Sequence, residues 1–151
     1  MADTNKPVEQ YMALALQPVM RGAHKREDIA TNIEHIAELS YAAIWLSGID
    51  LPVRLLAIPE GALQGFTDEI FDWDHEYYVE HMAIDIPGPE TNALGKLAQE
   101  CNCYVIAQAK VRHPEFETVF QRRLHHRPQG QGHPRPLQGP GLRPGTFHRP
   151  S

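Results

Sequence analysis

Short apolar runs alternate with longer amphipathic segments in this chain, and the alternation is the feature that most constrains its fold. Three runs have strand length and are almost wholly apolar, namely residues 11–17, 53–58 and 104–107. Such runs are typical of strands buried on both faces of a sheet. Helical spacing and helix-start signals predict helices over residues 26–47, 74–82 and 89–100. The order strand, helix, strand, helix, strand predicts an α/β fold with a layered sheet.

The composition changes sharply near residue 120. The last 31 residues, 121–151, hold six Arg, six Pro and five Gly but no Lys and no acidic residue, so they carry +6. Because the whole chain carries −5, residues 1–120 carry −11. A stretch with so few bulky apolar residues cannot bury a core. We therefore expect one α/β unit over 1–120 and a basic, disordered tail over 121–151.

Several classes of protein are excluded by what the sequence lacks. No apolar run reaches the roughly 18 residues of a membrane span. The first ten residues do not have the basic-then-apolar order of a secretory signal. Cys101 and Cys103 lie two residues apart, so they cannot provide a disulfide framework. We expect a cytoplasmic protein without membrane contact, and the acidic unit argues against nucleic acid as its ligand.

The segment that follows the second apolar run carries a motif. Residues 59–66 read Pro-Glu-Gly-Ala-Leu-Gln-Gly-Phe, in which Pro-Glu is followed by four residues, a glycine and an aromatic residue. This order resembles the first signature of the nitrilase (carbon–nitrogen hydrolase) superfamily. The first apolar run, ending in Gln17, and the stretch from Ile86 to Ile106 are similar to further elements of the family in the same order. The resemblance covers roughly residues 10–120.

The resemblance implies a fold and a reaction. The fold would be a partial α-β-β-α sandwich, with two sheets face to face and helices outside. The reaction would be hydrolysis of a non-peptide carbon–nitrogen bond in a nitrile, amide or carbamoyl compound, without metal or cofactor. In the family a cysteine thiolate attacks the carbon, a glutamate is the general base, and a lysine stabilises the tetrahedral intermediate. A thiol needs a base, and developing negative charge needs a fixed cation. Intact members commonly form oligomers.

Glu60 matches the general base of that set. It follows a predicted strand on a turn that begins with proline, where an α/β sheet presents side chains to a crevice. The simpler interpretation is a solvated loop carboxylate. The resemblance makes Glu60 the one catalytic residue that we assign.

The other two members of the catalytic set are not identifiable. Lys96 falls within a predicted helix, and Lys110 lies just past the third predicted strand, earlier than the family's lysine. Cys101 and Cys103 lie between a helix and a strand rather than at the strand-to-helix turn of the nucleophile. We interpret both cysteines as small structural thiols, buried or half-buried. The chain as written is therefore expected to be inactive.

The tail departs from the family abruptly. After residues 113–120, which look like the approach to another strand, Val, Ile, Tyr, Asp, Glu, Lys and Asn are all absent. An out-of-frame reading of a GC-rich gene gives such a composition, so we hypothesise a frameshifted and truncated hydrolase. Translation of the gene in the other two frames beyond codon 120 tests this, since one frame must then encode a strand, a lysine and a later cysteine.

A non-catalytic α/β interaction domain with a basic arm is the alternative. Arg122, Arg123 and Arg127 begin such an arm, which would bind nucleic acid or another acidic partner. Phe147 is the only aromatic residue in the tail, so bases would have little to stack on. The tail histidines have no regular ligand spacing, so adventitious metal capture is the most that we expect of them.

Overall fold

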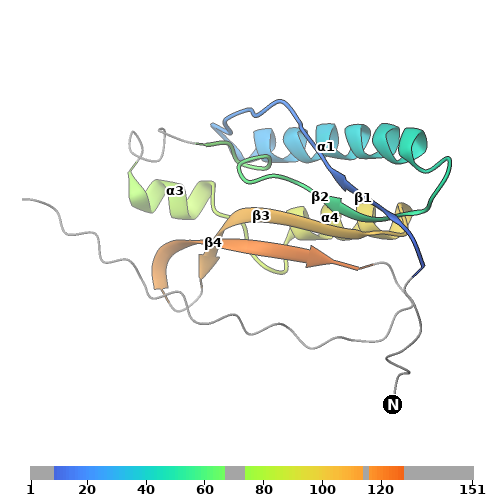
Figure 1. Cartoon of the computed structure of the whole chain (residues 1–151). Helices are drawn as coiled ribbons and strands as arrows, with labels where there is room; N and C mark the ends of the chain where they lie inside the picture. The colour runs from blue at the N-terminus through green and yellow to red at the C-terminus, as the bar shows by residue number, and fades with distance from the viewer. Residues whose placement is uncertain (1–8, 67–73, 114–115, 128–151) are drawn as a thin grey trace, which may run out of the picture.

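The computed structural model describes residues 9–66, 74–113 and 116–127, which form a mixed α/β unit with one four-stranded sheet and three helices (Figure 1). The helices are α1 (Arg26–Ser47), α3 (His75–His81) and α4 (Pro89–Glu100). The strands are β1 (Met12–Ala15), β2 (Val53–Ala57), β3 (Tyr104–His113) and β4 (Phe116–His126). The predicted α/β class is confirmed, and so is the predicted order strand, helix, strand, helix, strand, which corresponds to β1, α1, β2, α4 and β3. The short helix expected near residue 74 is α3.

The strands lie in the order β1-β2-β3-β4. The first three are parallel, with Leu55 of β2 opposite Tyr104 of β3. Strand β4 returns antiparallel to β3, so that Leu124 lies opposite Ala107. The carboxyl ends of β1, β2 and β3 therefore meet at one edge of the sheet, where α/β proteins commonly place their sites.

Strand β4 changes the expected boundary of the tail. It runs to His126, so residues 121–126 pair with β3 instead of belonging to a disordered segment that begins at 121. Their backbone pairs with β3, and this pairing forms the strand although the apolar pattern of its sequence is weak. The rest of the expected tail, residues 128–151, lies outside the described residues.

Local signals in the sequence set the helix starts. The Asp28 carboxylate accepts hydrogen bonds from the backbone N–H groups of His24 and Lys25, at 2.9 and 3.2 Å. Helix α4 starts with proline at its first position, and the Thr91 hydroxyl accepts from the N–H of Gly88 at 2.8 Å. Both arrangements satisfy backbone groups near a helix start. Among the described helices, none has both the length and the apolar character that crossing a membrane requires.

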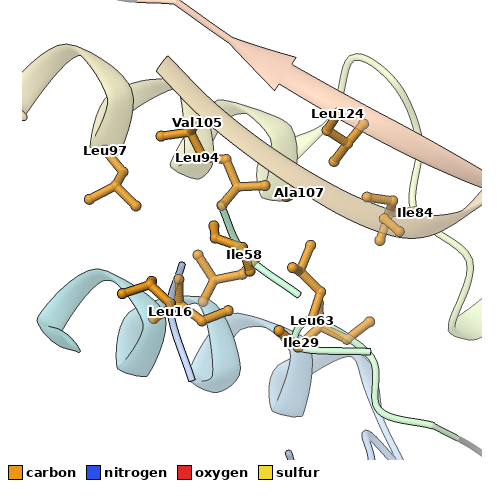
Figure 2. Packing of buried hydrophobic residues seen from close by; sticks show 14 of the residues in the cluster. Leu16, Ile29, Ile58, Leu63, Ile84, Leu94, Leu97, Val105, Ala107 and Leu124 are labelled. Atoms are coloured by element: carbon orange, nitrogen blue, oxygen red, sulfur yellow. The ribbon is translucent and has the colours of Figure 1, made fainter. Parts of the chain in front are cut away.

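One hydrophobic core lies between the sheet and the helices α1 and α4 (Figures 1 and 2). Helix α4 contributes Leu94 and Leu97, and α1 contributes Ile29. Val105 and Ala107 face them from β3, and both are buried. Since side chains alternate along a strand, Ile106, which lies between these two, belongs to the opposite face of the sheet.

The opposite face of the sheet is open in the described part of the chain; it is apolar along β1 and β2 and turns polar further along β3, at Gln108 and Lys110. Ala13 and Ala15 of β1 are exposed, while Leu55, Ala57 and Ile106 are only half-buried. No second sheet covers this face within residues 9–66, 74–113 and 116–127. The two-sheet sandwich implied by the resemblance is therefore not present in the described residues, although one face is covered by helices as that architecture requires.

Candidate functional site

The candidate site is the turn of residues 59–66, which we call the Glu60 turn. The ladder of β2 continues one residue beyond the strand, because the N–H of Ile58 donates to the carbonyl of Ile106 at 2.8 Å. Pro59 then ends the ladder, since it has no N–H to donate. Glu60 follows, exposed, at the carboxyl edge of the parallel strands. The structure thus places Glu60 at the end of a strand, as the sequence predicts.

Two glycines give the Glu60 turn its shape. Gly61 and Gly65 have positive φ angles of 78° and 84°, a region that other residues enter only at a cost. The N–H of Gly65 donates to the carbonyl of Gly61 at 2.7 Å and closes the turn. A Cβ on Gly65 would lie 2.6 Å from the Cα of Gly22, so the turn touches the backbone of the β1–α1 loop. Only glycine allows this approach.

Helix α1 is hydrogen-bonded to the Glu60 turn through Asn32. The side chain of Asn32 is buried, and its amide donates to the carbonyls of Leu63 and Arg21, at 3.0 and 3.1 Å. The N–H of Ala23 donates to the carbonyl of Gln64 at 3.2 Å. The Glu60 turn and the β1–α1 loop are therefore joined to each other and to α1 by hydrogen bonds as well as by close packing.

Gln64 joins the turn to β3. Its side chain is 3% exposed, and its Oε1 accepts from the N–H of Lys110 at 2.7 Å. Its Nε2 donates to the carbonyl of Lys110 at 3.0 Å and to the carbonyl of Met82 at 2.8 Å. The Gln64 amide thus forms a two-way pair with one residue of β3, like the next rung of a ladder after β2 has ended.

A small hollow opens between the turn and β3. It is shallow: its empty volume of about 270 Å³ includes open solvent, and the centre of a water molecule can occupy only about 20 Å³ of it. It is lined by residues 60–61, 64–66 and 108–110. Glu60 and Lys110 therefore line the same space, one from each side. The Lys110 ammonium also lies 5.5 Å from the centre of the Tyr78 ring, which places it within reach of a cation–π contact. The lining of the hollow thus includes an acidic residue, a basic residue and the amide-bearing residue Gln108.

The two cysteines lie at the other edge of the sheet. Cys103 precedes β3, whereas Glu60 follows β2, and the strands are parallel. The strand spacing of roughly 3.3 Å per residue separates these two levels by more than about 13 Å. Burial, with smaller contributions from Cys101, raises the pKa of Cys103 to about 11. Burial also raises the pKa of Cys101. Both thiols are therefore poorly reactive and distant from Glu60, as their interpretation as structural thiols requires.

Two residues of the hollow were missed by reasoning from the sequence. Lys110 was set aside as lying past the third strand, but β3 continues to His113 and carries Lys110 along the hollow. Gln64 was noted only as one of the residues between Glu60 and Gly65. The alternation of Gln108 and Lys110 with small apolar residues is the signal that would have indicated a longer strand with a polar face.

In a comparison of the chain with models of known protein families, no family model matches it.

Proposed function

We propose that this chain carries part of the active site of a hydrolase that acts on non-peptide carbon–nitrogen bonds. Glu60 is the general base in this proposal. One observation carries it: at the carboxyl edge of a parallel sheet, a turn fixed on three sides places Glu60 in the lining of a hollow that Lys110 of β3 also lines. A carboxylate can accept the proton of a nucleophile, and an ammonium can stabilise charge that develops on the substrate.

The resemblance to the nitrilase superfamily supplies the reaction class, with nitriles, amides and carbamoyl compounds as substrates. The open apolar face of the sheet supports the matching architecture, since an α-β-β-α sandwich buries such a face against a second sheet. An apolar surface of this kind is otherwise unfavourable in water. A second sheet packed on Ala13, Ala15 and Ile106 belongs to the proposal.

The residues described here are not expected to turn over substrate by themselves. Cys101 and Cys103 are the only thiols in the sequence, and both lie at the edge of the sheet opposite Glu60. Loss of a catalytic nucleophile typically lowers kcat by about 10⁴-fold or more. Release of ammonia from amides or nitriles, with Glu60→Gln as control, is therefore expected to stay at the background rate. Release that depends on Glu60 would show that another nucleophile serves the site.

Binding tests the proposal without turnover. An amide group offers N–H donors to a carboxylate and a carbonyl acceptor to an ammonium, so benzamide is a suitable probe of the hollow. Equilibrium dialysis should show saturable binding of benzamide to the chain and a loss of at least about tenfold in affinity for Glu60→Gln, equivalent to one charged hydrogen bond. Glu38→Gln, on the exposed side of α1, is the matched control and should bind as the unchanged chain does. Equal binding by Glu60→Gln would refute the proposal.

The alternative is a non-catalytic interaction domain that binds an acidic partner. Its specific support is the arginine-rich sequence that begins within β4 and continues beyond it. Binding to nucleic acid that weakens steeply as salt rises, together with no benzamide binding, would favour this alternative. The two outcomes separate the functions, because the hollow is lined by residues 60–61, 64–66 and 108–110 and not by the arginines.

A further inference from the structure

The Gln64 side chain occupies an unusual place for a glutamine. The carboxyl end of β2 pairs with β3 as far as Ile58, and the backbone then turns away at Pro59. Further along β3, the N–H of Lys110 faces the Gln64 Oε1 instead of a backbone carbonyl. The carbonyl of Lys110 accepts from the N–H of Ile84 at 3.1 Å as well as from the Gln64 Nε2. A side-chain amide thus completes the edge of the strand at the residue that lines the hollow.

We propose that Gln64 is a positioning residue, which joins the Glu60 turn to β3 and thereby sets Lys110 opposite Glu60 across the hollow. Burial makes the connection strong, because an amide hydrogen bond that water cannot replace is costly to leave unmade. The Gln64 side chain reaches three backbone groups of two segments, at 2.7, 2.8 and 3.0 Å. Displacement of this amide would release the turn from β3 and alter the separation of the two charged groups.

The inference rests on the proposed function only in treating the hollow as a site. The distance between the Glu60 and Lys110 side chains can be tested whether or not the hollow binds a substrate. That geometry can be read without substrate by a water-soluble carbodiimide. The reagent activates the Glu60 carboxylate, the Lys110 amine displaces the urea, and an isopeptide bond joins the two side chains. The linked peptides are measured by mass spectrometry after digestion. Lys110→Arg, which lacks the amine, identifies the product because its linked peptide must disappear.

Gln64→Met is the decisive variant, since methionine has nearly the same length and volume but offers no amide. We expect the unchanged chain to give the Glu60–Lys110 link and Gln64→Met to give at least about fivefold less, because proximity governs such intramolecular reactions. The comparison is made at a temperature where both chains have the same circular dichroism. Gln99→Met makes the same exchange on the exposed side of α4 and should link normally.

Each outcome decides the question. A merely structural role for Gln64 would lower the unfolding midpoint but leave the link unchanged in the folded chain, so equal yields overturn the proposal. Absence of the link in the unchanged chain overturns it too. If Gln64→Met does not fold, Gln64→Asn replaces it, since its amide is one methylene shorter and cannot keep all three hydrogen bonds; a full yield then refutes the proposal.

The unchanged chain supplies a test that needs no variant. The Lys110 N–H is held by the buried Gln64 side chain, so its exchange with solvent should be at least about a hundredfold slower than in an unstructured peptide. Exchange at the unprotected rate would overturn the proposal. A normal link together with absent benzamide binding would leave the role of Gln64 intact and remove the function assigned to the hollow, so the two proposals fail separately.

Discussion

Replacement of Gly65 by alanine should damage the Glu60 turn more than any other single methyl group added to it. The backbone at Gly65 has φ 84°, which costs a residue with a Cβ about 1–2 kcal/mol. The new Cβ would also lie 2.6 Å from the Cα of Gly22 and 3.1 Å from the carbonyl oxygen of Arg21. Both of these atoms belong to the backbone, so the β1–α1 loop must shift to remove the overlap, which costs a further 1–3 kcal/mol or so. We expect Gly65→Ala to lower the free energy of unfolding by about 2–5 kcal/mol.

Gly61→Ala is the matched control. Gly61 has nearly the same φ, 78°, but the atoms nearest to its added Cβ belong to the ring of Phe66, at 2.9 Å. That ring is 64% exposed and can rotate away, so Gly61→Ala should cost only the strain of about 1–2 kcal/mol. Urea unfolding with unchanged m values measures both losses. A loss for Gly65→Ala no larger than that for Gly61→Ala would refute the close packing of the turn against the β1–α1 loop.

Three further predictions concern buried or charged groups outside the Glu60 turn. Arg26→Met removes the partner of the buried Glu90 carboxylate, 2.8 Å away, and should lower the free energy of unfolding by about 1–3 kcal/mol in urea titrations. Burial, with a smaller effect of the adjacent histidine, lowers the pKa of His126 below 6.5 in the folded chain. The unfolded chain then takes up the proton first as pH falls, so stability should decline below about pH 6.5 and decline less in His126→Leu. At pH 8 iodoacetamide should modify Cys101 well before the wholly buried Cys103, as peptide mass spectrometry would show; equal rates would contradict the burial.

The sequence was sufficient wherever structure depends on residues close together in the chain. Helix α1 matches its predicted range because apolar spacing marks its interior and Gly48 its end. Helix α4 begins at Pro89, whose ring suits a first helical position. Glu60 was located correctly because Pro59 marks the end of the strand before it. Each of these signals acts through the backbone of its own segment.

The contacts that make the hollow were not predictable in the same way. Gln64 finds its partners at Met82 and at Lys110 of β3, 18 and 46 residues further along the chain, and no local pattern encodes such pairs. Lys110 became part of the site only because β3 extends past the run that marked it, with β4 as its partner. Long-range pairing lengthened both strands beyond what their own composition favours.

The central claim is that Glu60 and the facing part of β3 form one ligand site. Mapping of the backbone amide signals by NMR during a benzamide titration tests it most directly. The account predicts saturable shifts concentrated in residues 60–66 and 108–110, which disappear in Glu60→Gln. Shifts concentrated on α1 or on β1, with residues 60–66 unmoved at saturation, would contradict it.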